Sequence, residues 1–345
     1  MTKSIRRAGW MAAVAASALW AAPAGAAPKY TLKFATLAPE GSAWMQRFEQ
    51  MKKEVLEATG GAVQLKAYPG GVLGDEKEVL FKMKVGQVDG GGFMGSGTGQ
   101  ICPDARTLMM PMIFRDYDEV DAVFGKMQPL LEQACLENGY VALGWAEIGF
   151  SYVYSTKPVH GFSDLRQAKA WSVAADPVLT ELFKVAKVDT IIVPVSDVLT
   201  ALQTGLIQTV YAPPLACVAM QWFTKIKYWT DQRVVYSYGG VFVTRKSWEK
   251  IPAELREKVS AICHRAMKDL TAQVRKSNEE SFKVMADNGI QPVHSSPADI
   301  AEFEAVGREA TKNLRGTVFS AAAYDEMEKD LIEYRARHPA PAGAK

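Results

Sequence analysis

Residues 168–187, AKAWSVAADPVLTELFKVAK, place a strand, a turn and a helix in immediate succession. The strand is expected over 169–173, after which Asp176 can cap the open backbone amides of a helix. Pro177 suits the first helical position, because an N–H at that position has no partner inside the helix. Ligands of open α/β sheets bind at such junctions. The stretch therefore predicts both an α/β fold and the location of a binding site.

The same alternation of strand and helix is expected along the rest of the chain. Apolar periodicity predicts strands over 30–35, 63–68, 88–95, 140–147, 152–155 and 190–194, and helices over 43–59, 76–84, 117–138, 179–185 and 198–205. The last third, 252–337, is expected to be nearly all helical apart from an extended piece at 290–293. Alternating elements are typical of α/β folds. Because no linker-like stretch interrupts the sequence, two domains joined by crossing strands are favoured over two independent domains connected by a linker.

The first residues read as a secretory signal rather than as part of the fold. Lys3, Arg6 and Arg7 precede an apolar run over 10–22, and small residues lead to a cleavage site near Ala26. The mature protein is therefore expected in the periplasm.

Charge excludes some classes of partner. The full chain carries 40 basic and 38 acidic residues, and the leader contains three of the basic ones, so the mature protein is close to neutral. A near-neutral chain without basic clusters argues against nucleic acid or an anionic membrane surface as partner.

Metal, nucleophile and nucleotide motifs give no support for an enzyme. The four histidines and four cysteines are scattered and never spaced as metal ligands; they are His160, His264, His294 and His338, and Cys102, Cys135, Cys217 and Cys263. The sequence has no GxSxG elbow, although a triad assembled in space is not visible in sequence. A disulfide is compatible with an exported protein, but its pairing does not follow from sequence. We expect no metal, no cofactor and no catalytic activity.

Residues 90–95, GGGFMG, match the GxGxxG pattern of dinucleotide-binding folds. That motif has to join a strand to a helix, whereas these glycines lie within a strand-like stretch and Pro103 follows soon after. Close approach of a ligand or a β-bulge explains the glycines better than a nucleotide site.

Aromatic and sulfur-containing residues gather near the predicted strand ends. They are Phe93, Met94, Met109, Met110, Met112, Phe114, Phe150, Tyr152, Tyr154, Trp171, Tyr211, Met220, Trp222, Tyr236 and Tyr238. Core packing accounts for most of them. A subset that includes Phe93, Met94, Tyr152 and Tyr236 is expected to line an apolar pocket with a few polar groups.

Four stretches carry a family resemblance. They read LAPEGSAW at 37–44, YPGGVLG at 68–74, PMIFRDY at 111–117 and PVSDVLTALQTG at 194–205. Together they resemble the solute-binding proteins of tripartite ATP-independent periplasmic (TRAP) transporters, the dicarboxylate-binding DctP-like family. The resemblance runs in order over essentially the whole mature chain.

The resemblance implies two α/β lobes around a ligand cleft, with a long helix bridging them. The implied divisions are a signal peptide at 1–26, lobe I at 27–151 and 239–282, lobe II with the bridging and C-terminal helices at 152–238 and 283–338, and a disordered tail at 339–345. Such proteins close on a small molecule and present it to integral membrane permease subunits.

The chain departs from this family at the residues that clamp a carboxylate. The family's arginine lies in a segment like LKGLKIRV, and its position is held here by Trp171. A second arginine follows a Gly-Phe pair, where this chain has Ser151. The family's DGQENP segment reads QTVYAP, so Tyr211 and Ala212 replace its Glu and Asn. Asp197 retains the acidic character of a helix start in that family.

These departures predict an uncharged or largely apolar ligand, because the bidentate donors that hold a carboxylate are replaced by flat apolar surface. A cationic ligand over Trp171 and Tyr211, near Asp197, is a weaker option. A further alternative is a ligand-free interaction module, with Trp171 filling the cleft and another periplasmic protein as partner.

Overall fold

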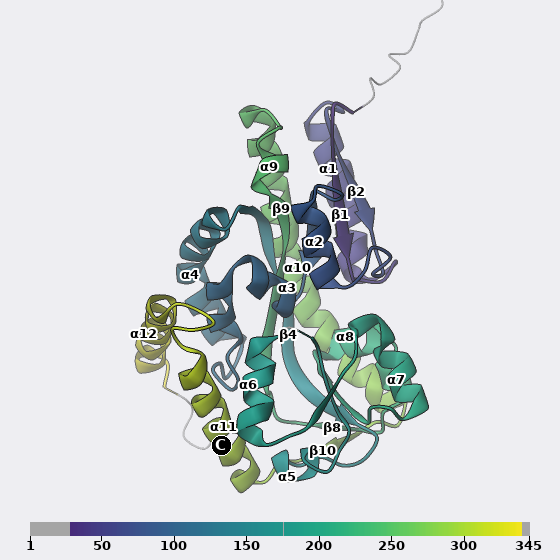
Figure 1. The fold of residues 1–345 in the computed structure, drawn as a ribbon, viewed down its shortest axis with the longest axis vertical. Coiled ribbons are helices and arrows are strands. Elements are labelled where there is room, and N and C mark those ends of the chain that lie inside the picture. The colour runs from purple at the N-terminus through teal and green to yellow at the C-terminus, as the bar shows by residue number, and fades with distance from the viewer. Residues whose placement is uncertain (1–27, 175, 340–345) are drawn as a thin grey trace, which may run out of the picture.

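The computed structural model describes residues 28–174 and 176–339, which form two lobes sharing one sheet (Figure 1). The predicted signal peptide and the tail from residue 340 onward lie outside the described residues. Within them, ten strands form the sheet in the order β2-β1-β3-β9-β4-β7-β5-β6, with β8 paired to β4 and β10 to β8. Strands and helices alternate along most of the chain, so the predicted α/β class is confirmed.

Lobe I is the half of the sheet from β2 to β4. Its strands are β1 (Tyr30–Thr36), β2 (Val63–Tyr68), β3 (Gly90–Phe93), β9 (Val235–Thr244) and the first part of β4 (Tyr140–Ser155). Its helices are α1 (Ala43–Ala58), α2 (Glu76–Lys84), α3 (Gly95–Ile101), α4 (Tyr117–Glu137) and α9 (Arg245–Trp248). Helix α1 buries Phe48, Met51 and Val55 because their spacing places them on one face, and Phe48 meets Phe34 of β1 edge-on at 5.7 Å.

Lobe II continues the sheet beyond β4. Its strands are β5 (Ala170–Ser172), β6 (Thr190–Ile192), β7 (Thr209–Ala212), β8 (Tyr228–Thr230) and β10 (Gln291–Val293). Its helices are α5 (Phe162–Leu165), α6 (Pro177–Ala186), α7 (Val198–Thr204), α8 (Pro214–Ala219) and α11 (Pro297–Leu314).

The strand–turn–helix predicted at 168–187 is confirmed in lobe II. Strand β5 leads to α6, which begins at Pro177. The Asp176 carboxylate accepts hydrogen bonds from the amides of Val178 at 2.9 Å and Leu179 at 3.2 Å. The cap and the proline together fix where the helix begins.

Strand β4 joins the two lobes. Up to Ser151 it pairs with β9, and from Tyr152 to Ser155 it pairs with β7 and β8 of lobe II. The sequence predicted two strands here, over 140–147 and 152–155, and that prediction is wrong. Register shifts at Ala142/Gly144 and Glu147/Gly149 bend the strand without ending it.

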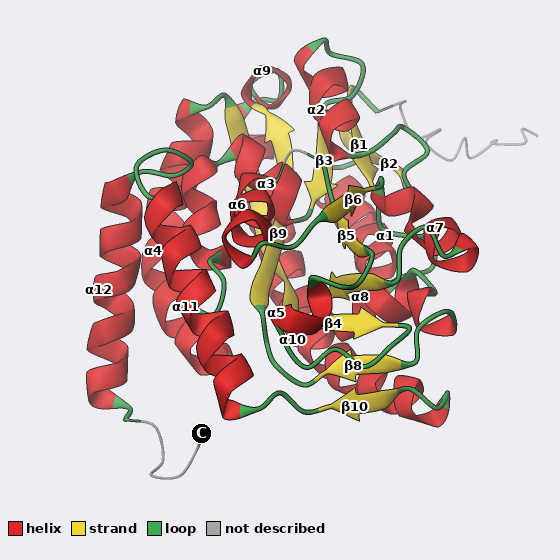
Figure 2. Ribbon diagram, turned by 60° about the horizontal axis from the view of Figure 1, so that its bottom comes forward, coloured by secondary structure: helices red, strands yellow, loops and turns green. Residues whose placement is uncertain are grey.

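A helix of 35 residues, α10 (Ala253–Asp287), runs along both lobes (Figure 1). It is about 50 Å long at 1.5 Å per residue, and it packs against α1, α8 and β4. Helix α11 packs against α6, whereas α12 (Ala321–Arg337) lies beside α4 of lobe I (Figure 2), where Lys126 pairs with Asp330 at 2.6 Å. Among the described residues, every helix is too short or too polar to cross a bilayer.

Gly149 is the residue on which the bend of β4 depends. Its φ of +114° is a conformation that other residues rarely adopt, and a Cβ there would lie 2.4 Å from Nδ2 of Asn278. That amide group ties α10 to the bend, because it donates to the Ile148 carbonyl at 2.9 Å.

We expect Gly149→Ala to destabilise the protein by about 1–3 kcal/mol, because the strained backbone and the clash with Asn278 act together. Thermal unfolding followed by far-ultraviolet circular dichroism checks this. Gly125→Ala is the matched control, since Gly125 is exposed within α4 and its Cβ would meet open space, so the melting temperature should rise slightly. An unchanged melting temperature for Gly149→Ala would show that the bend does not require glycine.

Candidate functional site

A cavity of about 330 Å³ lies between the two lobes, which is the size of a small-molecule site. Lobe I contributes the start of α2, Met94 at the end of β3, and Arg106 and Met109 of the 3-10 helix Pro103–Met109. Lobe II contributes the strand–turn–helix around Trp171, together with β7 and α8. Ser151 and Ser237, from β4 and β9, lie on the walls between them.

Trp171 forms an apolar wall of this cavity. Its indole N–H donates to the Val193 carbonyl at 2.9 Å, so the single polar group of the side chain is already used by the protein. The ring stacks on Tyr211 at 4.9 Å and meets Trp222 edge-on at 5.4 Å. Trp171 is only 4% exposed, and its contacts with Val193, Tyr211 and Trp222 fix its position. The side chain therefore offers a ligand a rigid apolar surface and no hydrogen-bond donor.

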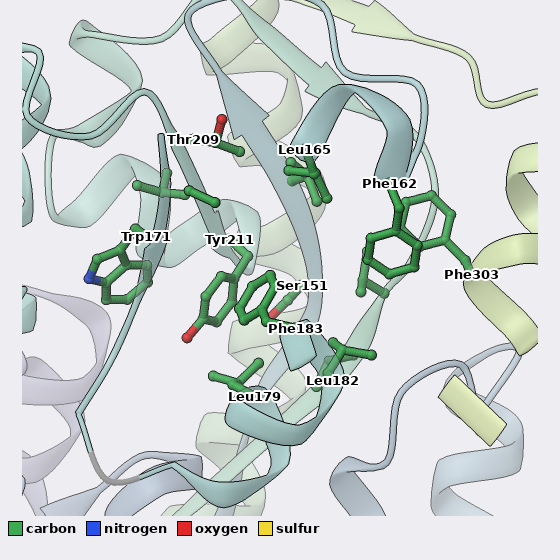
Figure 3. A pocket seen from close by; sticks show the side chains of 15 residues that line it. Ser151, Phe162, Leu165, Trp171, Leu179, Leu182, Phe183, Thr209, Tyr211 and Phe303 are labelled. Atoms are coloured by element: carbon green, nitrogen blue, oxygen red, sulfur yellow. The ribbon is translucent and has the colours of Figure 1, made fainter. Parts of the chain in front are cut away.

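Tyr211 lies between Trp171 and Phe183 (Figure 3). Behind it is a second, nearly filled apolar cavity of about 30 Å³, lined also by Leu182 and Phe303. The Tyr211 hydroxyl is buried and makes no hydrogen bond of good geometry among the described residues, although the Val173 backbone lies close enough to lower its pKa slightly. Burial raises the pKa of this phenol well above its ordinary value, so it stays protonated and can act as a neutral donor.

Of the eight residues predicted for the site, Trp171, Tyr211, Ser151 and Met94 line the cavity between the lobes. The Ser151 hydroxyl shares a hydrogen bond of 2.8 Å with that of Ser237, in which either oxygen can donate. Phe93 is 2% exposed and borders a smaller neighbouring cavity instead.

The other three predicted residues lie elsewhere. Asp197 is exposed at the start of α7, where it accepts a hydrogen bond from Ser196 at 3.3 Å. Tyr152 packs edge-on against Trp229. Tyr236 is buried and donates to Glu147 at 3.2 Å. None of the three is among the described residues that line the cavity.

Arg106 is a site residue that the sequence did not indicate. It is 6% exposed, lines the cavity from lobe I, and donates to the Gly99 carbonyl. Burial lowers the pKa of its guanidinium, and the carboxylate of Asp176 in lobe II offsets part of that effect. Burial also raises the pKa of the Asp176 carboxyl, while the Arg106 charge acts in the opposite direction.

Glu76 is the second such residue. It is the first residue of α2, is 7% exposed, and accepts hydrogen bonds from the amides of Met94 and Gly97. Burial raises the pKa of this carboxyl to about 8, so it is mostly protonated at neutral pH.

The Gly-rich stretch at 90–95 is explained by packing against protein groups, whereas the sequence favoured close approach of a ligand or a β-bulge. A Cβ on Gly91 would lie 2.8 Å from the Ala35 carbonyl, and one on Gly97 would lie 2.9 Å from the Glu76 carboxylate. These glycines allow close approach of protein groups and do not form a phosphate-binding loop. Within residues 28–174 and 176–339, no group of His, Cys, Asp or Glu is arranged to hold a metal ion.

Two α/β lobes joined by crossing strands, with a small-molecule cavity between them, define the class of periplasmic solute receptors. A family model described as bacterial extracellular solute-binding protein, family 7 (DctP) matches residues 34–316, and the chain belongs to that family. Its members are periplasmic TRAP receptors that bind small molecules and deliver them to membrane permease subunits, so the chain is a receptor and not an enzyme.

Individual relatives agree with this assignment. The chain is 23% identical over 295 residues to the C4-dicarboxylate-binding periplasmic protein DctP of Rhodobacter capsulatus, covering 83% of this chain and 86% of that protein. A TRAP solute-binding protein of Xanthobacter autotrophicus, solved with β-D-galacturonate, superposes with a TM-score of 0.81 at 17% identity, over 87% of this chain and 99% of that one. The pyroglutamate-binding receptor DctP7 of Bordetella pertussis gives 0.80 at 21% identity, over 88% and 99%. These structural likenesses show the fold.

We expect Glu76→Gln to change how stability depends on pH. The pKa of Glu76 is raised by folding, so its protonated form stabilises the protein fully below about pH 4.5, and this contribution is lost as the pH rises toward 8. The melting temperature of the natural protein, relative to that of the variant, should therefore fall over this range. Gln has a single acceptor oxygen, whereas the Met94 and Gly97 amides bond separate oxygens of Glu76, so the variant also loses stability by an amount that does not depend on pH.

Glu57→Gln removes the same charge from an exposed position of α1 and serves as control. A difference between the natural protein and Glu76→Gln that stays constant from pH 4.5 to 8 would contradict the raised pKa.

Proposed function

We propose that this TRAP receptor binds an uncharged, largely apolar solute by closing its lobes, and passes that solute to the permease. The observation that carries the proposal is the wall formed by Trp171, Tyr211 and Trp222 at the family's carboxylate-clamping position. The Trp171 indole N–H is bonded to Val193, so this wall offers a carboxylate no donor from that residue. Burial of apolar ligand surface against such a wall is worth about 25 cal/mol per Å² before association costs.

The charged groups around the cavity are consistent with a neutral solute. Arg106 is already bonded to Gly99 and faces the opposite charge of Asp176. Glu76 is mostly protonated near neutral pH. A free carboxylate would be repelled by the Asp176 carboxylate, which lines the cavity together with Arg106, whereas a neutral group meets no such repulsion.

The carboxylates bound by related receptors, such as galacturonate and pyroglutamate, are the obvious alternative ligands, and the experiment below includes them as probes. A ligand-free interaction module is less well supported, because a cavity of about 330 Å³ remains open beside Trp171. A module without a ligand would be expected to have this space filled by side chains.

The test is native mass spectrometry of the protein purified from its own periplasm, followed by organic extraction of the bound molecule. We expect a neutral, mainly apolar molecule that is lost in Trp171→Arg and kept in Trp171→Phe, which preserves an aromatic wall. Recovery of a carboxylate, or a melting temperature raised by galacturonate, pyroglutamate or succinate but not by a lipid extract, would overturn the ligand assignment.

A second prediction concerns the Tyr211 hydroxyl. This hydroxyl is shielded in the structure, so it can donate to the ligand only once the lobes have closed. We then expect Tyr211→Phe to weaken binding of the extracted ligand about threefold to tenfold, the value of one neutral hydrogen bond. Without ligand the variant should be at least as stable as the natural protein, because an unpartnered buried hydroxyl is removed. Isothermal titration calorimetry and thermal unfolding measure the two effects.

Tyr154→Phe is the matched control. Its hydroxyl is also buried without a partner among the described residues, but it lies outside the lining of the cavity. It should match Tyr211→Phe in stability and keep full affinity. Equal affinity in both variants would show that Tyr211 does not contact the ligand.

A further inference from the structure

A second chamber of about 140 Å³ opens beside the cavity between the lobes. The two spaces share four lining residues, Met94, Ile148, Ala216 and Met220, and are therefore adjacent along a common wall. We call the second space the side chamber. It has room for on the order of ten water-sized groups, which is enough for a chain of several carbons.

The side chamber is lined mainly by apolar groups. Trp44 of α1, Leu215 of α8 and Val274 of α10 form its walls. Its two side-chain hydroxyls already accept local hydrogen bonds, Thr36 from the amide of Ala38 at 3.2 Å and Ser42 from that of Met45 at 3.3 Å. The chamber therefore suits hydrocarbon better than a polar group.

A glycine helps to keep this space open. Gly92 lies on the wall of the chamber, and a Cβ there would point toward Thr36 Oγ1 at 3.2 Å and Trp44 at 3.8 Å. Any larger side chain would enter the space between β3 and the start of α1. The thioethers of Met94 and Met220 border both spaces, and their flexible side chains can adapt to a ligand that crosses between them.

We propose that the side chamber holds the apolar tail of the ligand, whose polar end lies in the main cavity near Tyr211. The ligand is then an elongated amphiphile with a neutral head and an alkyl or aryl tail. This inference rests on the proposed function, since it extends the same binding site to a second compartment.

Straight-chain primary alcohols from butanol to dodecanol, competing with the neutral fluorophore N-phenylnaphthylamine, provide the first test. Each added methylene should tighten binding about fourfold until the chamber is full. Ala219→Leu fills the side chamber and should remove the gain for the longer alcohols, while butanol binds as before. Leu215→Ala enlarges the chamber and should extend the gain to longer chains. Unchanged butanol affinity also shows that each variant is folded.

A bromine-terminated dodecanol locates the tail directly. Bromine quenches tryptophan fluorescence on contact, so the quenching should be reduced in Trp44→Phe, which removes the one tryptophan that lines the side chamber. Trp248→Phe, which removes a buried tryptophan of α9 outside both spaces, should leave the quenching intact.

The outcomes separate the two proposals. If the alcohols displace the fluorophore while chain length and Ala219→Leu leave the affinity unchanged and Trp44→Phe leaves the quenching unchanged, the side chamber is not a tail site. The proposal of a receptor for apolar solutes is then retained. If neither the fluorophore nor any alcohol binds, and carboxylates do, the ligand class itself is wrong and the tail site falls with it.

Discussion

The hydrogen-bonded ladder between β4 and β9 is the constraint on which the rest of the molecule depends. It holds the middle of lobe I together, and β4 then continues into lobe II without a break. Because backbone hydrogen bonds on both sides of the bend fix the direction of the strand, the two lobes face each other across a defined gap. Asn278 of α10 supports the same bend through its bond to Ile148. The cavity between the lobes exists because these elements hold its two walls apart.

Much of the fold was predictable because its signals are local. A strand, a capping aspartate and a first-turn proline predicted the junction of β5 and α6, and the structure contains it. The break predicted within β4 was wrong for a physical reason. Gly149 and the irregular pattern around it are typical of a turn, but the antiparallel partner β9 compensates for the register shift and keeps the strand continuous. Pairing between residues almost a hundred positions apart leaves no local trace.

The residues of the candidate site also fall into those that sequence could predict and those that it could not. Trp171, Tyr211, Ser151 and Met94 follow strand ends or family positions, so sequence could single them out. Glu76 resembles an ordinary acidic residue in the first turn of a helix, and its role appears only when Met94 and Gly97 approach it from another element. Arg106 lies in a short 3-10 helix whose sequence has no distinctive pattern. Charged residues of this kind become site residues through tertiary contacts that single-sequence patterns do not encode.

The path of the chain has a consequence for how such receptors can change over generations. Each lobe is assembled from two separate segments, because β9 with the start of α10 returns to lobe I after most of lobe II, and β10 with α11 then returns to lobe II. A single genetic crossover cannot transplant either lobe intact; it exchanges part of lobe I together with all or part of lobe II. A new solute preference is therefore reached more readily by substitutions along the walls of the cavity, for example at Trp171 or Tyr211, than by shuffling whole lobes.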